Sequence, residues 1–270
     1  MITKKNVNSL SGASILLCCL LGVLFFVAPV FADVDKGLQI SVERKNRDKG
    51  WRDSHAKFKM VLINKRGENS IRLLDMKTLE VDDDGDKSLM VFDEPKDVKG
   101  TALLSYSHAV EPDDQWLFLP SIKRTKRIAS RNKSGPFMGS EFAYEDLSSF
   151  ELEKYTYRYL GDEVYMGQES FIVDQLPVDE FSGYTHQRAW IDKVHYRPLR
   201  IEFYDRKESL LKTLYLDDYQ QHLGKYWRAH KMIMKNHQTG NTTELVTLNM
   251  TFQAGLTDRD FSQASLKRSR

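Results

Sequence analysis

The stretch FKMVLINKRGENSIRLLDM, residues 58–76, carries the pattern that decides the fold class. Over residues 58–63, and again over residues 71–76, side chains alternate between two faces with a period of two, which is the period of a β-strand. The polar residues 65–69 between them, with Gly67 at the centre, have the composition of a tight turn. The stretch therefore predicts an antiparallel hairpin.

The same alternation with a period of two continues in short segments to the end of the chain. Turn residues such as Asp84-Gly85, Leu160-Gly161-Asp162 and Leu223-Gly224 lie between these segments. No linker, repeat or low-complexity segment interrupts the series, so residues 33–270 are predicted to form one domain. About a dozen antiparallel strands must close into a barrel, split into a sandwich or curl around something. The further candidate strands are residues 87–92, 101–107, 115–119, 154–160, 164–176, 185–192, 199–205, 210–220, 226–236 and 242–253.

The first 32 residues predict export from the cytoplasm. Lys4-Lys5 form a positive start, residues 15–27 form an apolar run, and Val30-Phe31-Ala32 offers small residues before a cut. This is the pattern of a secretory signal peptide, cleaved after Ala32. After the leader, residues 33–49 predict a short helix that places Leu38, Val42 and Lys45 on one face and ends at Gly50.

Both cysteines, Cys18 and Cys19, lie inside this leader, so the mature chain is expected to contain no disulfide. A lipid anchor would need a small residue before the modified cysteine, but Leu17 precedes Cys18, which disfavours it. Removing the leader leaves 38 basic against 38 acidic residues. A nucleic-acid partner is therefore not indicated, because such a partner normally needs a clustered basic excess.

Known catalytic motifs do not appear in the mature chain. Gly139 precedes Ser140, but no glycine-x-serine-x-glycine elbow surrounds that serine, and the seven histidines form no metal-binding motif. The acidic run Asp82–Asp86 has some of the spacing of a calcium loop, but Lys87 stands where a glycine is needed, so a solvated hairpin tip is the better interpretation. The chain is predicted not to be an enzyme and to need no cofactor and no metal.

One basic cluster stands out, formed by residues 123–127 with Arg131 and Lys133. Such a cluster can attract an anionic membrane surface. The alternative is internal pairing with Glu141, Glu145 and Asp146 nearby in the sequence, and that alternative is favoured because a partly buried acid normally needs a partner.

Several blocks of the sequence resemble those of a known family. The blocks DQWLFLP (residues 114–120), Arg124 with Arg127-Ile128, and FMGSEFAYEDL (residues 137–147) closely resemble the LolA-like outer-membrane lipoprotein-sorting proteins. Residues 99–104, 184–192, 211–213 and 261–266 look like later blocks of the same family, in order. The family pattern usually has Asp where Glu141 stands, which is a conservative departure.

The resemblance implies a mainly β (α+β) fold: an unclosed, strongly curved antiparallel half-barrel in a single domain, with short helices covering its concave face as a lid. It implies a periplasmic protein that carries acyl chains. The sequence agrees in three respects, namely the export signal, the long meander and the lack of catalytic groups. Aromatic residues make up 11% of the chain, which suits a cavity lining and a solid core alike.

Within this fold, PFMGSEFAYEDL, residues 136–147, is predicted to leave the sheet between two strands as a short helix or tight plug. It either lines and gates the cavity or is purely structural, and both roles stay open. Glu145 and Asp146 are expected to hold it by pairing with Arg124 or Arg127. The candidates for cavity and lid residues are Trp116, Phe118, Phe137, Met138, Phe142, Tyr144 and Trp190.

The function that follows is non-covalent binding of a lipid or lipidated ligand in an apolar cavity, with lipoprotein sorting to the outer membrane as one version. The partners implied are lipid or lipoprotein acyl chains and an inner-membrane exporter of the RND type, for a carrier that is monomeric. The alternative is a non-enzymatic adaptor subunit of such an exporter, with a cavity filled by its own side chains.

Overall fold

The structure, a computed structural model, describes residues 33–268 of the chain, and side chains up to residue 266. The predicted signal peptide of residues 1–32, with its cut after Ala32, lies outside the described residues, as do Cys18 and Cys19. The elements in chain order are α1 (Val34–Arg47), β1 (Asp53–Ile63), β2 (Asn69–Leu79), β3 (Lys87–Glu94), β4 (Ala102–Tyr106), β5 (Asp114–Leu119), η1 (Pro120–Ile122), β6 (Arg124–Ile128), η2 (Ser130–Asn132), η3 (Tyr144–Leu147), η4 (Leu152–Lys154), β7 (Tyr155–Tyr165), β8 (Gln168–Pro177), β9 (Tyr184–Asp192), β10 (Pro198–Asp205), β11 (Leu210–His222), β12 (Tyr226–Asn236), β13 (Thr242–Phe252), η5 (Asp258–Phe261) and α2 (Gln263–Arg268).

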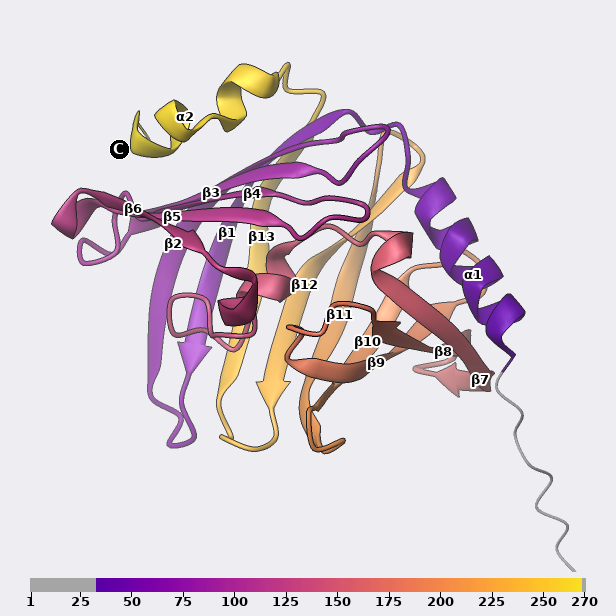
Figure 1. The fold of residues 1–270 in the computed structure, drawn as a ribbon. Helices are drawn as coiled ribbons and strands as arrows, with labels where there is room; N and C mark the ends of the chain where they lie inside the picture. Colours follow the sequence, from indigo (N-terminus) through magenta and orange to yellow (C-terminus); the bar gives the residue numbers. More distant parts are fainter. Residues whose placement is uncertain (1–32, 269–270) are drawn as a thin grey trace, which may run out of the picture. The chain divides into compact units, whose positions relative to one another are not determined.

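The strands of residues 33–268 form one 13-stranded antiparallel sheet in the order β6-β5-β4-β3-β2-β1-β13-β12-β11-β10-β9-β8-β7. The first and last strands, β1 and β13, pair with each other in the middle of the sheet. The two edges are therefore β6 and β7, which follow each other in the chain and are not paired within the described part. The strands curl around a hollow and the sheet stays open (Figure 1). This confirms the predicted half-barrel.

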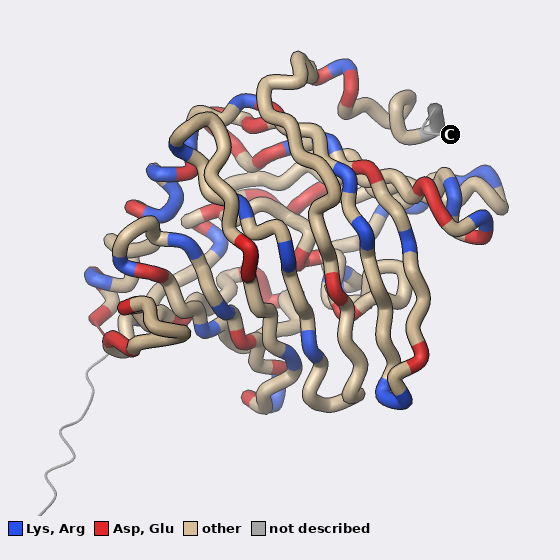
Figure 2. Tube along the Cα trace, turned by 180° about the vertical axis from the view of Figure 1, so that it is seen from behind, with Lys and Arg blue, Asp and Glu red and all other residues tan. Residues whose placement is uncertain are grey.

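The residues that face the hollow form the main core. Phe58 and Met60 of β1, two positions apart, both belong to it, as the period of a strand requires. The C-terminal segment covers part of the outer face. Leu103 and Leu104 of β4 are neighbours and therefore face opposite sides, but both are buried, because the C-terminal segment packs Phe261 and Leu266 over the outer face. Seen from behind, basic and acidic residues are interspersed along the strands (Figure 2).

The connection between β6 and β7 has to travel from one edge of the sheet to the other. Residues 129–154 make this crossing, and they lie within the hollow, as the pink segment of Figure 1 shows. Phe137 and Phe142 from this connection join the same core as Phe58 and Met60. The predicted plug segment thus enters the hollow because the strand order leaves its ends at opposite edges.

Helix α1 packs against the edge strand β7. Its N-terminus is fixed by backbone bonds between Asp33 and Tyr159, and its buried residues are Gly37, Ile40 and Ser41. The predicted helix is confirmed, and the side chain of Leu38 on it is exposed. The physical reason is a close approach: a Cβ at Gly37 would lie 2.8 Å from the backbone nitrogen of Tyr159, so the glycine decides which face meets the strand.

Most predicted strands are present, with two corrections. The turn predicted at Leu160-Gly161-Asp162 was wrong, because β7 continues through it with a bulge between Tyr159 and Gly161, and the chain turns at Met166-Gly167 instead. Strand β6 was not predicted, because its sequence RTKRI is polar at all but one buried position, Ile128. Being an edge strand, β6 does not need the apolar alternation from which strands are recognised.

Candidate functional site

Two cavities lie in the hollow. The larger has a volume of about 870 Å³ and the smaller about 600 Å³, within the range of pockets that hold small organic ligands. Apolar side chains from β1, β2, β11, β12 and β13 line the larger cavity, namely Phe58, Met76, Leu216, Met232 and Met250. The methionines among them are flexible side chains that adapt to ligands of varied shape.

The smaller cavity is lined from both the sheet and the connection. Ile201, Phe203 and Leu214 come from β10 and β11, and Phe142 comes from the plug segment. Both cavities are therefore built on the concave face, with the connection as one wall. An acyl chain needs this kind of apolar surface and few specific polar contacts.

A short partition separates the two cavities. Arg44, Ser148, Ser149 and Phe150 line both of them. The guanidinium carbon of Arg44 lies 4.1 Å from the centre of the Phe150 ring, and Phe150 in turn stacks on Tyr155 with 6.0 Å between ring centres. The partition is thus a cation stacked on an aromatic pair.

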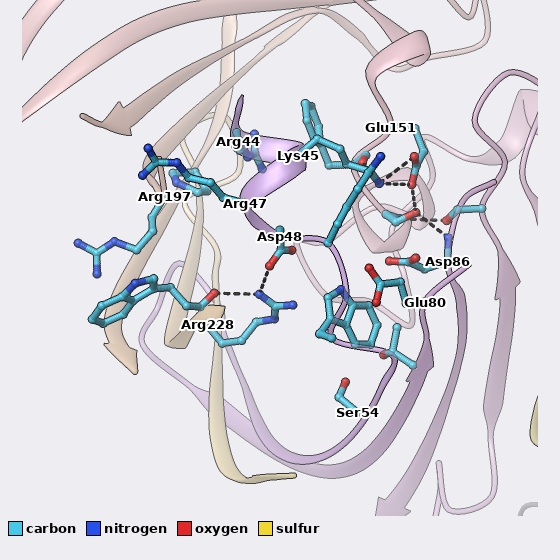
Figure 3. A pocket seen from close by; sticks show the side chains of 18 of the residues that line it. Arg44, Lys45, Arg47, Asp48, Ser54, Glu80, Asp86, Glu151, Arg197 and Arg228 are labelled. Atoms are coloured by element: carbon cyan, nitrogen blue, oxygen red, sulfur yellow. Dashed lines mark hydrogen bonds and ion pairs between the residues drawn. The ribbon is translucent and has the colours of Figure 1, made fainter. Parts of the chain in front are cut away.

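Neighbouring charges hold this partition in place. Lys45 donates from Nζ to Glu151 at 2.9 Å and to the backbone oxygen of Phe150 at 3.0 Å (Figure 3). The side chain of Ser149 donates to the Glu151 carboxylate at 2.6 Å. Because the Glu151 side chain is only 4% exposed, these bonds connect the last turns of α1 firmly to the crossing connection.

Two polar atoms of the partition are left without partners. Nη1 of Arg44 and Oγ of Ser148 are buried and accept or donate no hydrogen bond within residues 33–268. Burial lowers the pKa of Arg44, partly offset by nearby tyrosines and Asp48, although the side chain as a whole is only half-buried. Unpartnered buried cations are uncommon in folded proteins.

The plug segment is anchored by a pair that the sequence analysis missed. Nζ of Lys212, on β11, lies 2.6 Å from the Asp146 carboxylate, and each side chain is only 4% exposed. The same nitrogen donates to the backbone oxygen of Glu141 at 2.9 Å. Asp146 also accepts from the hydroxyl of Tyr184 at 2.8 Å. A lone lysine in a strand of mixed polarity carried no signal for this role.

The predicted pairing of Glu145 or Asp146 with Arg124 or Arg127 was therefore wrong. Arg127 pairs instead with Asp114 on the neighbouring strand β5, and Glu145 accepts from Ser182 and from the backbone of Gly183. Arg124 makes no ion pair within the described residues. The reason is topological: β6 lies at the sheet edge with Arg124 and Arg127 exposed, away from the interior of the hollow.

Four of the seven cavity candidates point into the hollow. Phe137 is fully buried and stacks on Phe92 at 5.7 Å, with Tyr144 edge-on at 5.6 Å. Phe142 is buried and lines the smaller cavity, while Met138 packs against the main core. Gly139 and Met138 both have positive φ, which lets the segment turn tightly, and Arg72 donates to the Met138 oxygen at 2.6 Å.

The other three candidates lie on the outer face of the sheet. Trp116 and Phe118 pack in the cluster covered by the C-terminal segment, and neither lines the two cavities. Trp190 is buried between Ala189 and Ile191, which belong to the main core, so it faces the opposite side, where Arg200 lies 4.3 Å from its ring centre. The sequence can assign an aromatic residue to a strand without showing which face of the sheet its side chain lies on. A shift of the strand register by one residue moves the side chain to the opposite face.

No helix in the part of the chain that the structure describes is long and apolar enough to cross a membrane. No group of three or more His, Cys, Asp or Glu side chains there is arranged to hold a metal ion.

Comparison with known proteins gives a consistent result. A family model described as "Uncharacterized protein" matches residues 84–268, and no curated protein matches. A crystal structure of a candidate outer membrane lipoprotein-sorting protein domain from Vibrio parahaemolyticus is 59% identical, with a TM-score of 0.86, and covers 87% of this chain and 100% of that one.

Two further solved structures extend the likeness. A DUF1329 family protein from Desulfovibrio piger is 27% identical with a TM-score of 0.82, over 86% of this chain and 98% of that one. A LolA superfamily protein from Nitrosomonas europaea shares the fold at 19% identity, with a TM-score of 0.68, over 85% of this chain and 99% of that one.

Proposed function

Because the chain belongs to the LolA-like family of outer-membrane lipoprotein-sorting proteins, we propose that it is a periplasmic carrier that binds a lipid or lipidated ligand non-covalently on its concave face. The observation that carries the proposal is the pair of cavities, of about 870 and 600 Å³, between the sheet and the crossing connection. Export through the predicted signal peptide of residues 1–32 and cleavage after Ala32 belong to the same proposal.

Burial of apolar surface supplies the binding energy. Each methylene group moved from water into an apolar cavity is worth about 0.8 kcal/mol, so an ordinary acyl chain binds without specific polar contacts. The methionine-lined floor of the larger cavity supports a tolerance for chains of different length. Delivery of lipoproteins to the outer membrane is one form of this carrier function.

The plug segment, residues 136–147, gates the smaller cavity in this proposal. Phe142 lines that cavity, so its replacement by Ala enlarges the cavity and changes ligand uptake measured with a fluorescent fatty acid. Phe118→Ala, at a buried phenylalanine on the outer face, is the matched control and leaves uptake unchanged. If Phe142→Ala lowers stability and leaves uptake unchanged, the plug is purely structural.

The first experiment is native mass spectrometry, with organic extraction, of the mature protein from Asp33 recovered from a bacterial periplasm. A lipid-sized adduct supports the carrier function and identifies the cargo class. Clean apo protein that also fails to bind a fluorescent fatty acid contradicts it, and favours the adaptor function beside an exporter of the RND type.

A further inference from the structure

An unpaired arginine lies where the two cavities meet. Arg44 lines both cavities, and its Nη1 is buried without a hydrogen-bond partner in residues 33–268. Its neighbours on α1 are both paired, Lys45 with Glu151 and Arg47 with Glu43. A cation with one buried nitrogen and no counter-charge in the chain is stabilised by an anion that comes from outside the chain.

The surroundings of Arg44 supply no such anion. The carboxylate that acts on it, that of Asp48, is paired with Arg228 at 2.5 Å (Figure 3). The other groups that act on it are the hydroxyls of Tyr155, Tyr157 and Tyr219. Burial raises the pKa of all three hydroxyls above the ordinary value of 10, so they are neutral at physiological pH.

Further charged groups line the larger cavity and contribute to the electrostatic field around Arg44. Arg197 is paired with Asp192, and the Glu151 carboxylate is occupied by Lys45 and Ser149. The remaining acids come from the loop after β2 and from the C-terminal end of the connection, namely Glu80, Asp82, Asp83, Asp84, Asp86 and Glu153. None of them is paired with Arg44.

The geometry of Arg44 suits recognition of an acidic head group. Its guanidinium lies over the ring of Phe150, and its Nη1 makes no hydrogen bond within residues 33–268, so this nitrogen can donate to a ligand. The N–H edge of a guanidinium donates two parallel hydrogen bonds to a carboxylate or a phosphate. Oγ of Ser148, also buried and unpartnered, lines the same two cavities and can donate a further bond.

We propose that the cargo is an anionic amphiphile whose carboxylate or phosphate head group binds Arg44 at the partition, with its apolar chains in the cavities on either side. The proposal rests on the carrier function and adds the charge of the cargo to it. A neutral amphiphile with the same chain leaves Arg44 buried and unpaired, so it binds more weakly than the acid. Binding of either head group involves no covalent step.

The test compares ligands that differ only in the head group. Binding of hexadecanoic acid and hexadecan-1-ol, and of a monoacylglycerol phosphate and the corresponding monoacylglycerol, is measured at pH 8 by displacement of a neutral fluorescent reporter. We expect the wild-type protein to prefer each anion over its neutral counterpart by about tenfold or more. The relative affinity for the two anions shows whether a carboxylate or a phosphate is the better head group.

Variants of α1 test whether Arg44 is the residue that causes the preference for anions. Arg44→Met keeps the apolar stem against Phe150 and removes the charge, and it abolishes the preference for anions. Arg44→Lys keeps the charge without the planar fork and retains part of the preference. Lys36→Met, two turns earlier on the same helix, removes a cation that lines neither cavity and leaves the preference intact.

The outcomes separate the two proposals. Equal binding of acid and alcohol by the wild-type protein, or a full preference kept by Arg44→Met, overturns the anionic cargo and leaves the carrier function standing. Failure of all four ligands and of the reporter to bind overturns both. The comparison within the wild-type protein holds whether or not the variants fold. Arg44→Met is also expected to unfold at the same or a higher urea concentration than the wild-type protein, because it removes an unpaired cation whose Nη1 is buried.

Discussion

At the scale of single residues, the pair formed by Lys212 and Asp146 fixes where the crossing connection meets the sheet. Both side chains are buried, and Lys212 bonds to the backbone of the plug segment as well. A buried ion pair adds little net stability compared with apolar residues, but the loss of one partner leaves the other charge buried and unpaired. The pair therefore acts mainly by dictating one position for the plug.

Replacement of Lys212 by Met is expected to destabilise the protein by about 3–5 kcal/mol, the range found when one partner of a buried pair is removed. The measurement is urea unfolding followed by tryptophan fluorescence. Lys193→Met, at a more exposed pair with Asp162, is the matched control and should cost about 1 kcal/mol or less. If Asp146→Leu combined with Lys212→Met costs as much as the sum of the single changes, the two residues are not coupled.

A second residue-scale prediction concerns Asp86, which lines the larger cavity. Burial raises the pKa of its carboxyl from 3.8 to about 7, and the nearby Lys45 limits the rise, whereas Glu151 and Glu80 add to it. The folded state therefore holds a proton that the unfolded state releases. The stability that this proton provides is present in full below about pH 4 and is lost as the pH rises through about 7.

We accordingly expect Asp86→Asn, which is always neutral, to gain stability relative to the wild-type protein as the pH rises from 5 to 8. The difference between the free energies of unfolding of the variant and the wild-type protein should change by at most about 1.4 kcal/mol per pH unit. Urea unfolding at pH 5, 6, 7 and 8 measures it. A difference that is constant over this range would show that the Asp86 carboxyl titrates at its ordinary pKa in the folded protein.

At the scale of elements, α1 is held on β7 by a close backbone contact and carries the partition residues at its other end. Gly37 makes the contact, while Arg44 and Lys45 reach the connection two turns later. The helix therefore couples the edge of the sheet to the partition between the cavities. Separation of α1 from β7 should open the larger cavity and loosen the partition together.

Gly37→Val tests this coupling. Because a Cβ at residue 37 meets the Tyr159 backbone nitrogen at 2.8 Å, the helix must shift away, at a cost of about 1–3 kcal/mol. Hydrogen exchange should speed up in both α1 and residues 148–151. Gln39→Val, at an exposed position of the same helix, controls for the low helix propensity of valine. Faster exchange in α1 alone would mean that the partition is held by the connection and not by the helix.

At the scale of the whole described chain, the sheet has two free edges, and each is protected differently. β7 is capped by the bridge between Asp33 and Tyr159 and by α1. β6 is protected by exposed basic side chains, Arg124 and Lys126, which disfavour pairing with another strand. Of the predicted basic cluster, Arg127 and Lys133 pair internally, with Asp114 and Asp179.

Replacement of Arg124 and Lys126 together by Val should allow the edge strand β6 to pair with a strand of another molecule. We expect concentration-dependent association in sedimentation velocity and little change in the urea midpoint, because both side chains are exposed in the folded protein. A double change of the exposed Lys57 and Lys235, on inner strands, to Val is the control. A variant that sediments as the wild-type protein does would show that the charges on β6 do not protect it.

The antiparallel meander and most of its strands could be predicted from sequence, because alternation with a period of two and glycine-containing turns are local properties. Local signals were insufficient in two kinds of place. At Gly161 a turn-forming sequence lies inside β7 as a bulge, and at β6 an edge strand lacks an apolar face. For α1, a glycine with a close backbone contact decided the buried face against the apolar pattern.

The sequence by itself thus determined the meander, the family and the entry of residues 136–147 into the hollow with Phe137 and Phe142 inside. Only the tertiary structure decided that Trp116, Phe118 and Trp190 face outward, that Lys212 is the partner of Asp146, and that Arg44 is left unpaired between two cavities. The physical reason is that these facts depend on contacts between residues distant in the chain. Strand periodicity specifies that two faces exist, but the curvature of the sheet and the path of the connection decide which face is enclosed and which charges meet there.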